Sequence, residues 1–244
     1  MIIGADVSFY QDDNATPQKV DFAKMKANGA EFVILRAGQG SWSDPDFRDY
    51  WQSAKGIFPR GSYFYYDNRF NPKEQADLYV QQFNGDFGEL PLFCDFEDRR
   101  AGSYRKWQDW YTFIERLKAL VPNKEIGIYT AYYYWLERTA VKGIPAASLE
   151  YFKQYPLWVA NYKVDKPLVP KPWTEWTFWQ YTDKGDGSLY GVESKNIDLN
   201  YFNGDLAALQ TRFKLDGFTP SHDGINSLLA TLDNGEQIRF KKRG

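Results

Sequence analysis

The class of fold is indicated by a short apolar run that ends on two carboxylates, Leu90-Pro91-Leu92-Phe93-Cys94-Asp95-Phe96-Glu97. A run of this length is typical of a buried strand. The following segment, 103–122, places apolar side chains on one helical face and stops at a proline. We expect Ser103 to cap this helix. A strand followed by a helix is the repeating unit of a parallel α/β fold.

The same alternation of strand and helix patterns runs along most of the chain. A helix opened by Thr16-Pro17 and closed by Asn28-Gly29 follows the first strand. After the fifth strand, helical patterns are limited to 132–139 and 146–152. Eight strands with helices in the first five units predict an irregular, TIM-like (β/α)5β3 barrel of the α/β class. The expected strands are 2–8, 31–37, 60–66, 90–97, 125–130, 157–162, 177–181 and 196–199, with further helices at 45–55 and 72–83.

The pattern changes after residue 213. Two strand-like runs, 228–232 and 237–241, flank Asp233-Asn234-Gly235-Glu236, and Asn-Gly is a strong hairpin signal. We therefore expect a catalytic barrel over 1–213 and a loop with a β-hairpin over 214–244. A lone hairpin is marginally stable, so we expect it to dock on the barrel or on another copy, giving a homodimer.

Composition and charge exclude several classes of protein. The chain has 244 residues, normal for one barrel, with 30 basic and 32 acidic side chains and a net charge of -2. This balance gives no sign of a nucleic-acid partner, and no apolar run is long enough to predict a membrane span. Aromatic residues make up 18%. Most must fill the core, but indole and phenol rings also stack on sugars.

The beginning of the chain and its cysteine content give expectations about its compartment. Met1-Ile2-Ile3-Gly4 shows no signal-peptide pattern, so synthesis in the cytoplasm is expected, with export by a non-standard route or removal of a signal as the alternatives. The single cysteine, Cys94, excludes an intramolecular disulfide framework.

Asp95 and Glu97 are the candidate catalytic pair. Side chains of a strand alternate between faces, so these two acids point one way and Cys94 and Phe96 the other. Cys94 and Phe96 suit the helix-covered face, which leaves the carboxylates at the barrel mouth. Two adjacent acids raise each other's pKa, and one keeps its proton near neutral pH. A protonated acid beside an ionised partner is what a glycosidase needs.

Two further acids strengthen this interpretation. Asp6 closes the first strand and Asp198 the last. First and last strands of a parallel barrel are neighbours, so four carboxylates should gather at the C-terminal rim, where barrel enzymes place their sites.

Other chemistries have less support. The same acids could bind Mg²⁺ or Ca²⁺, but Gly38-Gln39-Gly40 is too short to indicate a phosphate site. The single histidine, His222, lies in the C-terminal loop, which disfavours a catalytic triad or a zinc site. We expect no metal and no cofactor.

Short motifs follow one another along the chain: Asp6-Val7-Ser8 with Gln11, Phe32-Val33-Ile34-Leu35-Arg36-Ala37, Gly61-Ser62-Tyr63, Asp95-Phe96-Glu97, Ile128-Tyr129-Thr130, Leu157-Trp158-Val159-Ala160 with Tyr162, Trp179-Gln180-Tyr181-Thr182 and Asp198-Leu199-Asn200. In this order they resemble glycoside hydrolase family 25, the Chalaropsis-type lysozymes. The resemblance runs from Asp6 to about Phe202. Asp12-Asp13 after Gln11, and Tyr63-Phe64-Tyr65 on the third strand, depart from the family's usual residues.

The resemblance implies a lysozyme that cuts peptidoglycan between N-acetylmuramic acid and N-acetylglucosamine. We expect the reaction to retain configuration. Glu97 matches the proton donor, and Asp95, Asp6 and Asp198 match the other active-site acids. Asp95 would act either as nucleophile or by orienting the substrate's N-acetyl group. The expected substrate-binding residues are Tyr63, Tyr65, Tyr129, Trp158, Tyr162 and Gln180.

Two other hypotheses compete with a peptidoglycan-cutting lysozyme. A non-catalytic glycan-binding module, for instance of a phage tail, would use the groove for attachment, but it would not need all four acids. An enzyme of the same class could instead cut chitin-like chains. The expected setting is a phage or prophage endolysin that reaches the cell wall by holin-type release.

Overall fold

The computed structural model describes residues 1–12, 19–140, 144–215, 227–231 and 237–241. Eight strands of this part form a closed barrel in the order β1-β9-β8-β7-β6-β5-β4-β2, and β1 pairs back onto β2. This confirms the predicted α/β barrel. The two-residue strand β3, Trp42–Ser43, folds back on β2. The barrel strands are β1 Ile2–Val7, β2 Ala30–Gln39, β4 Arg60–Tyr65, β5 Leu92–Asp95, β6 Ile126–Ala131, β7 Leu157–Ala160, β8 Phe178–Asp186 and β9 Asn196–Phe202.

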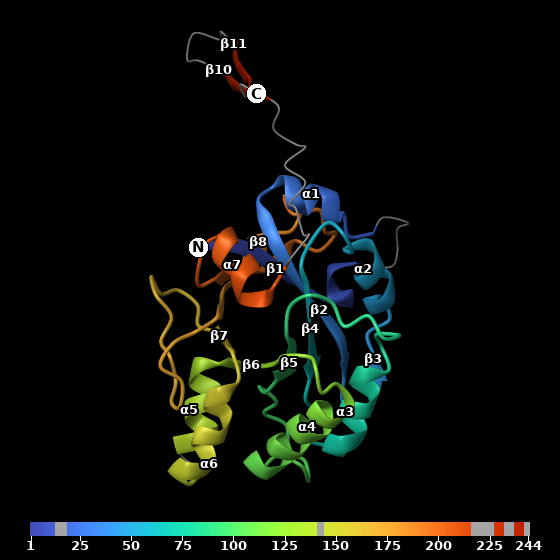
Figure 1. Cartoon of the computed structure of the whole chain (residues 1–244), viewed down its shortest axis with the longest axis vertical. Coiled ribbons are helices and arrows are strands. Elements are labelled where there is room, and N and C mark those ends of the chain that lie inside the picture. Colours follow the sequence, from blue (N-terminus) through green and yellow to red (C-terminus); the bar gives the residue numbers. More distant parts are fainter. Residues whose placement is uncertain (13–18, 141–143, 216–226, 232–236, 242–244) are drawn as a thin grey trace.

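Helices cover the outside of the barrel. Helix α3 packs against α4, and in Figure 1 helices α5 and α6 lie on the other side of α4. Five of the strands, β1, β2, β4, β5 and β6, have a helix in the connection to the next barrel strand, whereas β7 and β8 have none among the described residues. The α-helices of this part are α1 Phe22–Ala27, α2 Phe47–Ser53, α3 Pro72–Val80, α4 Trp107–Leu120, α5 Tyr132–Ala140, α6 Ala146–Glu150 and α7 Leu206–Phe213, and the 3-10 helices are η1 Phe9–Gln11 and η2 Tyr151–Gln154.

The last barrel strand runs in the direction opposite to the one expected. β9 is antiparallel to both β8 and β1, whereas the other barrel pairings are parallel. The connection between β8 and β9 spans only residues 187–195, which is too short for the crossover that a parallel pair requires. Because β9 is reversed, its beginning rather than its end lies at the rim with the carboxyl ends of the other strands. Asp198 reaches the site for this reason.

Two hydrophobic clusters divide the core between the outside and the inside of the barrel wall. Along β2, Val33 and Leu35 pack outward toward the helices, while Phe32 and Ile34 pack inside the barrel. This alternation is the two-residue period of a strand. The inner cluster also holds Leu209 of α7, so this helix closes the end of the barrel opposite the site. Its other buried members are Leu90, Phe93, Tyr129, Trp158, Ala160, Phe178, Phe202 and Leu215.

Two glycines make room for rings inside the barrel. A Cβ atom on Gly4 would lie 2.4 Å from the Phe32 ring, and one on Gly127 would lie 2.4 Å from the Phe93 ring. Both distances are far below a van der Waals contact, so a side chain at either position would force a ring to move. The small interior therefore depends on pairing aromatic residues with glycine on neighbouring strands.

One local prediction about a helix was wrong, one falls outside the described residues, and one helix was missed. The first helix begins at Phe22, because the Asp21 side chain accepts the hydrogen bond of the Lys24 amide and forms its N-cap. The expected opening at Thr16-Pro17 lies outside the described residues. Helix α4 begins at Trp107, with Lys106 rather than Ser103 at the N-cap. Helix α7 was not predicted at all.

The C-terminal hairpin is confirmed as a strand pair. β10, Ser227–Thr231, runs antiparallel to β11, Gln237–Lys241, and neither pairs with another described strand. The Asn234-Gly235 turn lies outside the described residues. Leu215, just past the expected end of the barrel, is buried in its inner cluster. Docking and dimerisation through the hairpin stay predictions, tested by comparing the molar mass of the full chain with that of a chain truncated after Leu215.

Within the described part of the chain, no helix combines the length and apolarity needed to cross a membrane.

Candidate active site

A cleft of about 340 Å³ opens where β1, β2, β4 and β5 end. The carboxyl ends of barrel strands are where barrel enzymes place their catalytic groups. All four predicted acids line it, together with two tyrosines of the predicted substrate-binding set. The lining residues are Asp6, Ser8, Tyr10, Gln11, Arg36, Gln39, Tyr63, Tyr65, Asp95, Glu97, Arg100 and Asp198.

The predicted orientation of the Asp95 segment is confirmed. Cys94 and Phe96 are fully buried in the cluster that faces the helices, whereas Asp95 and Glu97 line the cleft. β5 ends at Asp95, but the Phe96 amide still donates to the Tyr129 carbonyl of β6 at 2.9 Å. Glu97, two residues after Asp95, therefore continues the alternation of the strand and lies on the same face as Asp95.

Asp6 and Asp198 face each other across the antiparallel pair of β1 and β9. A hydrogen bond joins their carboxyl groups, with Asp198 as the donor to Asp6. Burial, followed by the nearby charge of Asp6, raises the pKa of Asp198 to about 8. Burial also raises the pKa of Asp6, to about 6, although the hydrogen bonds that it accepts oppose the rise. At neutral pH this pair therefore holds one proton between its two carboxyl groups.

A chain of neutral side chains fixes Asp6. Its Oδ2 atom accepts from Gln180 Nε2 at 2.9 Å and from Asn200 Nδ2 at 2.8 Å. The Oε1 atom of Gln180 in turn accepts from the hydroxyl groups of Tyr129 at 2.8 Å and Tyr162 at 2.5 Å. These contacts orient the Gln180 amide so that its donor points at the carboxylate. The ionised form of Asp6 is the form that the network stabilises.

Glu97 and Asp95 both hold their protons more tightly than isolated carboxyl groups. Burial, and next the charge of Asp6, raises the pKa of Glu97 to about 7. The pKa of Asp95 lies well above its usual range, first because the group is buried and then because Glu97 and Asp6 are close. The Oδ1 atom of Asp95 is buried and has no hydrogen-bond partner among the described residues.

One buried cation, Arg36, offsets part of this negative charge. It acts to lower the pKa of Asp95, and its Nε atom donates to Asp44 Oδ2 at 2.8 Å. Its guanidinium group lies 4.9 Å from the ring centre of Phe9, 5.0 Å from that of Tyr10 and 5.2 Å from that of Trp42. Cation–π contacts of this kind hold the charge beside the cleft.

The predicted substrate-binding residues divide by exposure. Tyr63 and Tyr65 line the cleft, and Tyr162 is partly exposed. Tyr129 and Trp158 are buried in the inner cluster and contact each other at 4.4 Å between ring centres. The Trp158 Nε1 atom donates to Asn200 Oδ1 at 2.7 Å, which orients the amide that binds Asp6.

Sequence reasoning missed several residues of the site. Ser8 and Gln11 bracket η1, where the Ser8 amide donates to Gln11 Oε1 at 2.8 Å. Their spacing is that of a capping box, a signal that the sequence did carry. Arg36 and Arg100 had no comparable signal, because nothing in a single sequence says which arginine faces a cleft.

No group of three or more His, Cys, Asp or Glu side chains within the described part of the chain has an arrangement that could hold a metal ion. Neighbouring acids instead raise the pKa values of Asp95, Glu97 and Asp198, which suits acid–base chemistry.

Comparison with known proteins identifies what the chain is similar to. The family model "Glycosyl hydrolases family 25" matches residues 5–189. Lysozyme M1 of Streptomyces globisporus is 30% identical over 84% of this chain and 69% of its own length. N,O-diacetylmuramidase of Chalaropsis sp is 27% identical over 85% of this chain and 96% of its own. The structure of a muramidase from Trichobolus zukalii superposes with a TM-score of 0.68 and 28% identity, covering 88% and 99%.

Proposed function

The chain belongs to glycosyl hydrolase family 25 and is a glycoside hydrolase of the muramidase type, and we propose that it cuts the β-1,4 bond between N-acetylmuramic acid and N-acetylglucosamine in peptidoglycan with retention of configuration. The observation that carries the proposal is the cluster of four carboxyl groups in one cleft, with protons distributed unequally among them. The alternative of a non-catalytic glycan-binding module is not favoured.

Glu97 is the proposed general acid. A pKa raised to about 7 keeps this carboxyl group protonated at and below neutral pH. It is only partly buried and lines the cleft, so a glycosidic oxygen can reach it. Donation of its proton to that oxygen as the C1–O bond breaks produces the alcohol leaving group and the positive charge at C1.

Asp95 is proposed to orient the substrate's N-acetyl group rather than to attack C1 itself. Asp95 lines the cleft beside Glu97, so its carboxyl group could accept the amide N–H of the substrate's N-acetyl group. That contact would direct the acetyl oxygen toward C1, where it acts as the internal nucleophile. Attack from the face opposite the leaving group is followed by attack of water, which gives its proton to the ionised Glu97. The two attacks together give net retention.

Asp6 and Asp198 are proposed to set the charge around this reaction. Asp6 is the acid most favoured to ionise, because two amide donors bind its Oδ2 atom. Its negative charge raises the pKa of Glu97 and would stabilise the positive charge that develops at C1. Asp198 is proposed to keep its proton and to donate a hydrogen bond to Asp6.

The sugar rings are proposed to contact the tyrosines that line or border the cleft, Tyr63, Tyr65 and Tyr162. Tyr129, Trp158 and Gln180 are proposed to act from behind this surface by fixing Asp6, directly through Gln180 or by way of Asn200. This division assigns stacking to accessible rings and positioning to buried ones.

The test is clearing of purified cell walls by wild type and by Glu97→Gln. The variant keeps the size of the side chain but removes the transferable proton, so clearing should be lost while the circular dichroism spectrum is unchanged. Glu175→Gln, on an exposed side chain, is the matched control and should clear normally. Substantial clearing by Glu97→Gln would remove Glu97 as the acid.

Members of this family act on the cell wall, and holin-type release of this chain in a phage setting stays part of the proposal. Its test is lysis of cells that express the chain with and without a pore-forming protein. Lysis only in the presence of the pore is the expected result, and rapid lysis without it would contradict this route.

A further inference from the structure

Two adjacent arginines follow the catalytic segment, and they have different surroundings. Arg100 lines the cleft, whereas Arg99 is absent from its lining and pairs with Glu137 on helix α5. Both side chains are partly exposed, at 39% for Arg100 and 58% for Arg99. The mechanism above uses neither of them.

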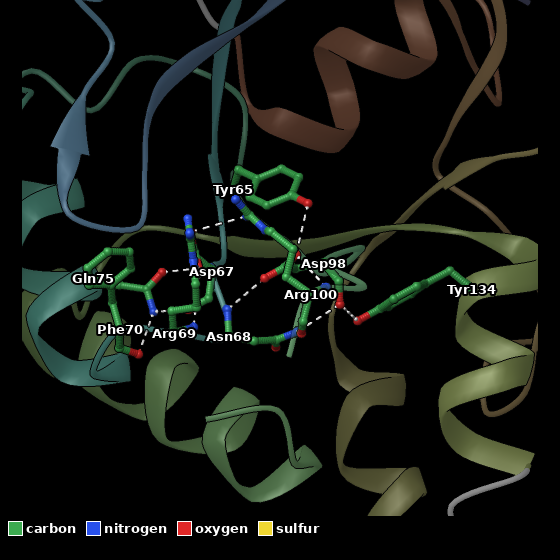
Figure 2. A network of polar contacts seen from close by, with 9 residues as sticks. All are labelled: Tyr65, Asp67, Asn68, Arg69, Phe70, Gln75, Asp98, Arg100 and Tyr134. Carbon is green, nitrogen blue, oxygen red and sulfur yellow. Dashed lines mark hydrogen bonds and ion pairs between the residues drawn. The ribbon is translucent and has the colours of Figure 1, made fainter. Parts of the chain in front are cut away.

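A network of polar contacts holds Arg100 at the edge of the cleft (Figure 2). Its Nε atom donates to Asp98 Oδ1 at 2.6 Å, and Nη2 lies 3.1 Å from Asp67 Oδ2. Both acids are almost completely buried, with 1% of each side chain exposed. The Asp98 carboxylate also accepts from the Asn68 amide at 2.8 Å, so the group that anchors Arg100 is itself fixed.

The outer part of the guanidinium group keeps donors for a ligand. The side-chain oxygen of Gln39, in the amide orientation that faces Arg100, accepts from Nη1 at 3.2 Å and from Nη2 at 3.0 Å. A guanidinium group has five N–H donors. Hydrogen bonds to Asp98 and Gln39 use three of them, and the contact with Asp67 is an ion pair, so at least one N–H on Nη1 has no hydrogen-bond partner among the described residues.

Arg100 is also the accessible positive charge of an acidic cleft. The lining contains four acids and two arginines, Arg36 and Arg100. Arg36 is 6% exposed and enclosed by aromatic rings, whereas Arg100 reaches solvent. Asp67 is shared with Arg69, so two arginines balance the two carboxylates and the anchors add no net negative charge beside the cleft. A negatively charged part of a substrate would find its attractive partner at Arg100.

We infer that Arg100 is a specificity-determining residue that binds a carboxylate of the peptidoglycan substrate. This inference rests on the proposed muramidase function. Muramic acid differs from glucosamine by a lactyl ether that carries a carboxyl group, and the stem peptide carries further carboxyl groups. The planar guanidinium fork suits this ligand, and its anchoring by Asp98 and Asp67 removes much of the entropy cost of ordering it.

The experiment measures kcat/KM for wild type, Arg100→Gln, Arg100→Lys and Arg99→Gln on two soluble substrates. One is peptide-free glycan strands with free lactyl carboxylates, and the other is the same strands after conversion of those groups to methyl amides. The quantity compared is the ratio of the two kcat/KM values for each protein. Arg99 helps to lower the pKa of Glu97, but that effect falls on both substrates and cancels in the ratio.

Wild type should prefer the carboxylate substrate by roughly 10-fold, the size of one partly exposed charge-assisted hydrogen bond. Arg100→Gln should lose this preference, Arg100→Lys should keep part of it, and Arg99→Gln should keep it all. Binding of both substrates to the proteins in a Glu97→Gln background gives a readout independent of catalysis. Intact peptidoglycan, whose lactyl groups are amide-linked to peptides, separates the two carboxylate sources.

The outcomes distinguish the inference from the function on which it rests. A preference that Arg100→Gln removes on peptide-free strands assigns the lactyl carboxylate, and one removed only on intact peptidoglycan assigns the stem peptide. A wild type that cuts both strand types, but whose ratio on the strands and whose activity on intact peptidoglycan are both unchanged by Arg100→Gln, would overturn the inference and leave the muramidase intact. Failure of wild type to cut any of these substrates would overturn both.

Discussion

Replacement of Glu97 by glutamine should stabilise the protein at alkaline pH and not at acidic pH. Burial and the charge of Asp6 raise the pKa of Glu97 from 4.5 to about 7. Between these values the folded protein keeps a proton that the unfolded chain releases, so the free energy of unfolding falls as pH rises. One pKa unit corresponds to about 1.4 kcal/mol, which gives a loss of roughly 3 kcal/mol by about pH 8.5. Glutamine resembles the protonated acid and escapes this loss.

The assay is urea unfolding of wild type and Glu97→Gln at about pH 4 and about pH 8.5, with equal m-values as the check on two-state behaviour. The stability difference in favour of the variant should grow by about 2–3 kcal/mol between the two conditions. The lower end allows for the coupled titration of Asp6, whose protonation adjusts when Glu97 ionises. Glu175→Gln, on an exposed side chain, should show little change. A difference that stays constant, or a variant less stable at the higher pH, would refute the assigned environment of Glu97.

Three further predictions follow from the same structure. The pH dependence of kcat/KM should be bell-shaped, with activity lost below about 6 as Asp6 gains a proton and above about 7 as Glu97 loses one, whereas a flat profile over this range would contradict the assignment. Gln180→Ala removes a donor to Asp6 and should lower kcat/KM by roughly 10-fold and move the acidic limb upward; an unmoved limb would count against this role. Arg60→Met should lower the free energy of unfolding in urea by about 3–5 kcal/mol, because Arg60 is fully buried and bound to Asp86 and Glu89. Lys55→Met, which removes an exposed partner of the same Asp86, should lower it by under about 1 kcal/mol, and equal losses would refute the role of burial.

The carboxylate segment could be predicted from sequence because its information is local. Alternation within 92–97 is enough to place Asp95 and Glu97 on one face and Cys94 and Phe96 on the other. The strand positions followed from apolar runs for the same reason. Helix α7 was missed although Asp205 is a good N-cap, whose side chain accepts from the Ala208 amide at 2.8 Å.

The direction of β9 could not be taken from its own residues, because a strand alternates in the same way whichever way it runs. The information lay in the connection: β8 extends to Asp186, further than the expected end at Tyr181, and the shorter remaining link permits only an antiparallel return. The prediction that Asp198 joins the site was therefore correct on an incorrect premise about strand direction.

The roles of aromatic residues and arginines required the structure. Trp158 and Tyr63 are both amphipathic aromatic residues on strands, yet one is buried behind the site and the other lines the cleft. The difference arises from their depth in the barrel, which depends on register between strands far apart in sequence. Arg99 and Arg100 are adjacent and chemically identical, and only their three-dimensional partners separate them.

Whether the protein is a muramidase is decided by the identity of the new reducing end that it makes in purified peptidoglycan. Digested material is reduced with borohydride, hydrolysed, and analysed for the sugar alcohols that form. A muramidase that uses Glu97 as its acid should yield the alcohol of muramic acid with wild type and none with Glu97→Gln. Formation of the alcohol of glucosamine instead would contradict the muramidase assignment. Formation of muramic acid alcohol at an undiminished rate with Glu97→Gln would contradict the role of Glu97 as the acid.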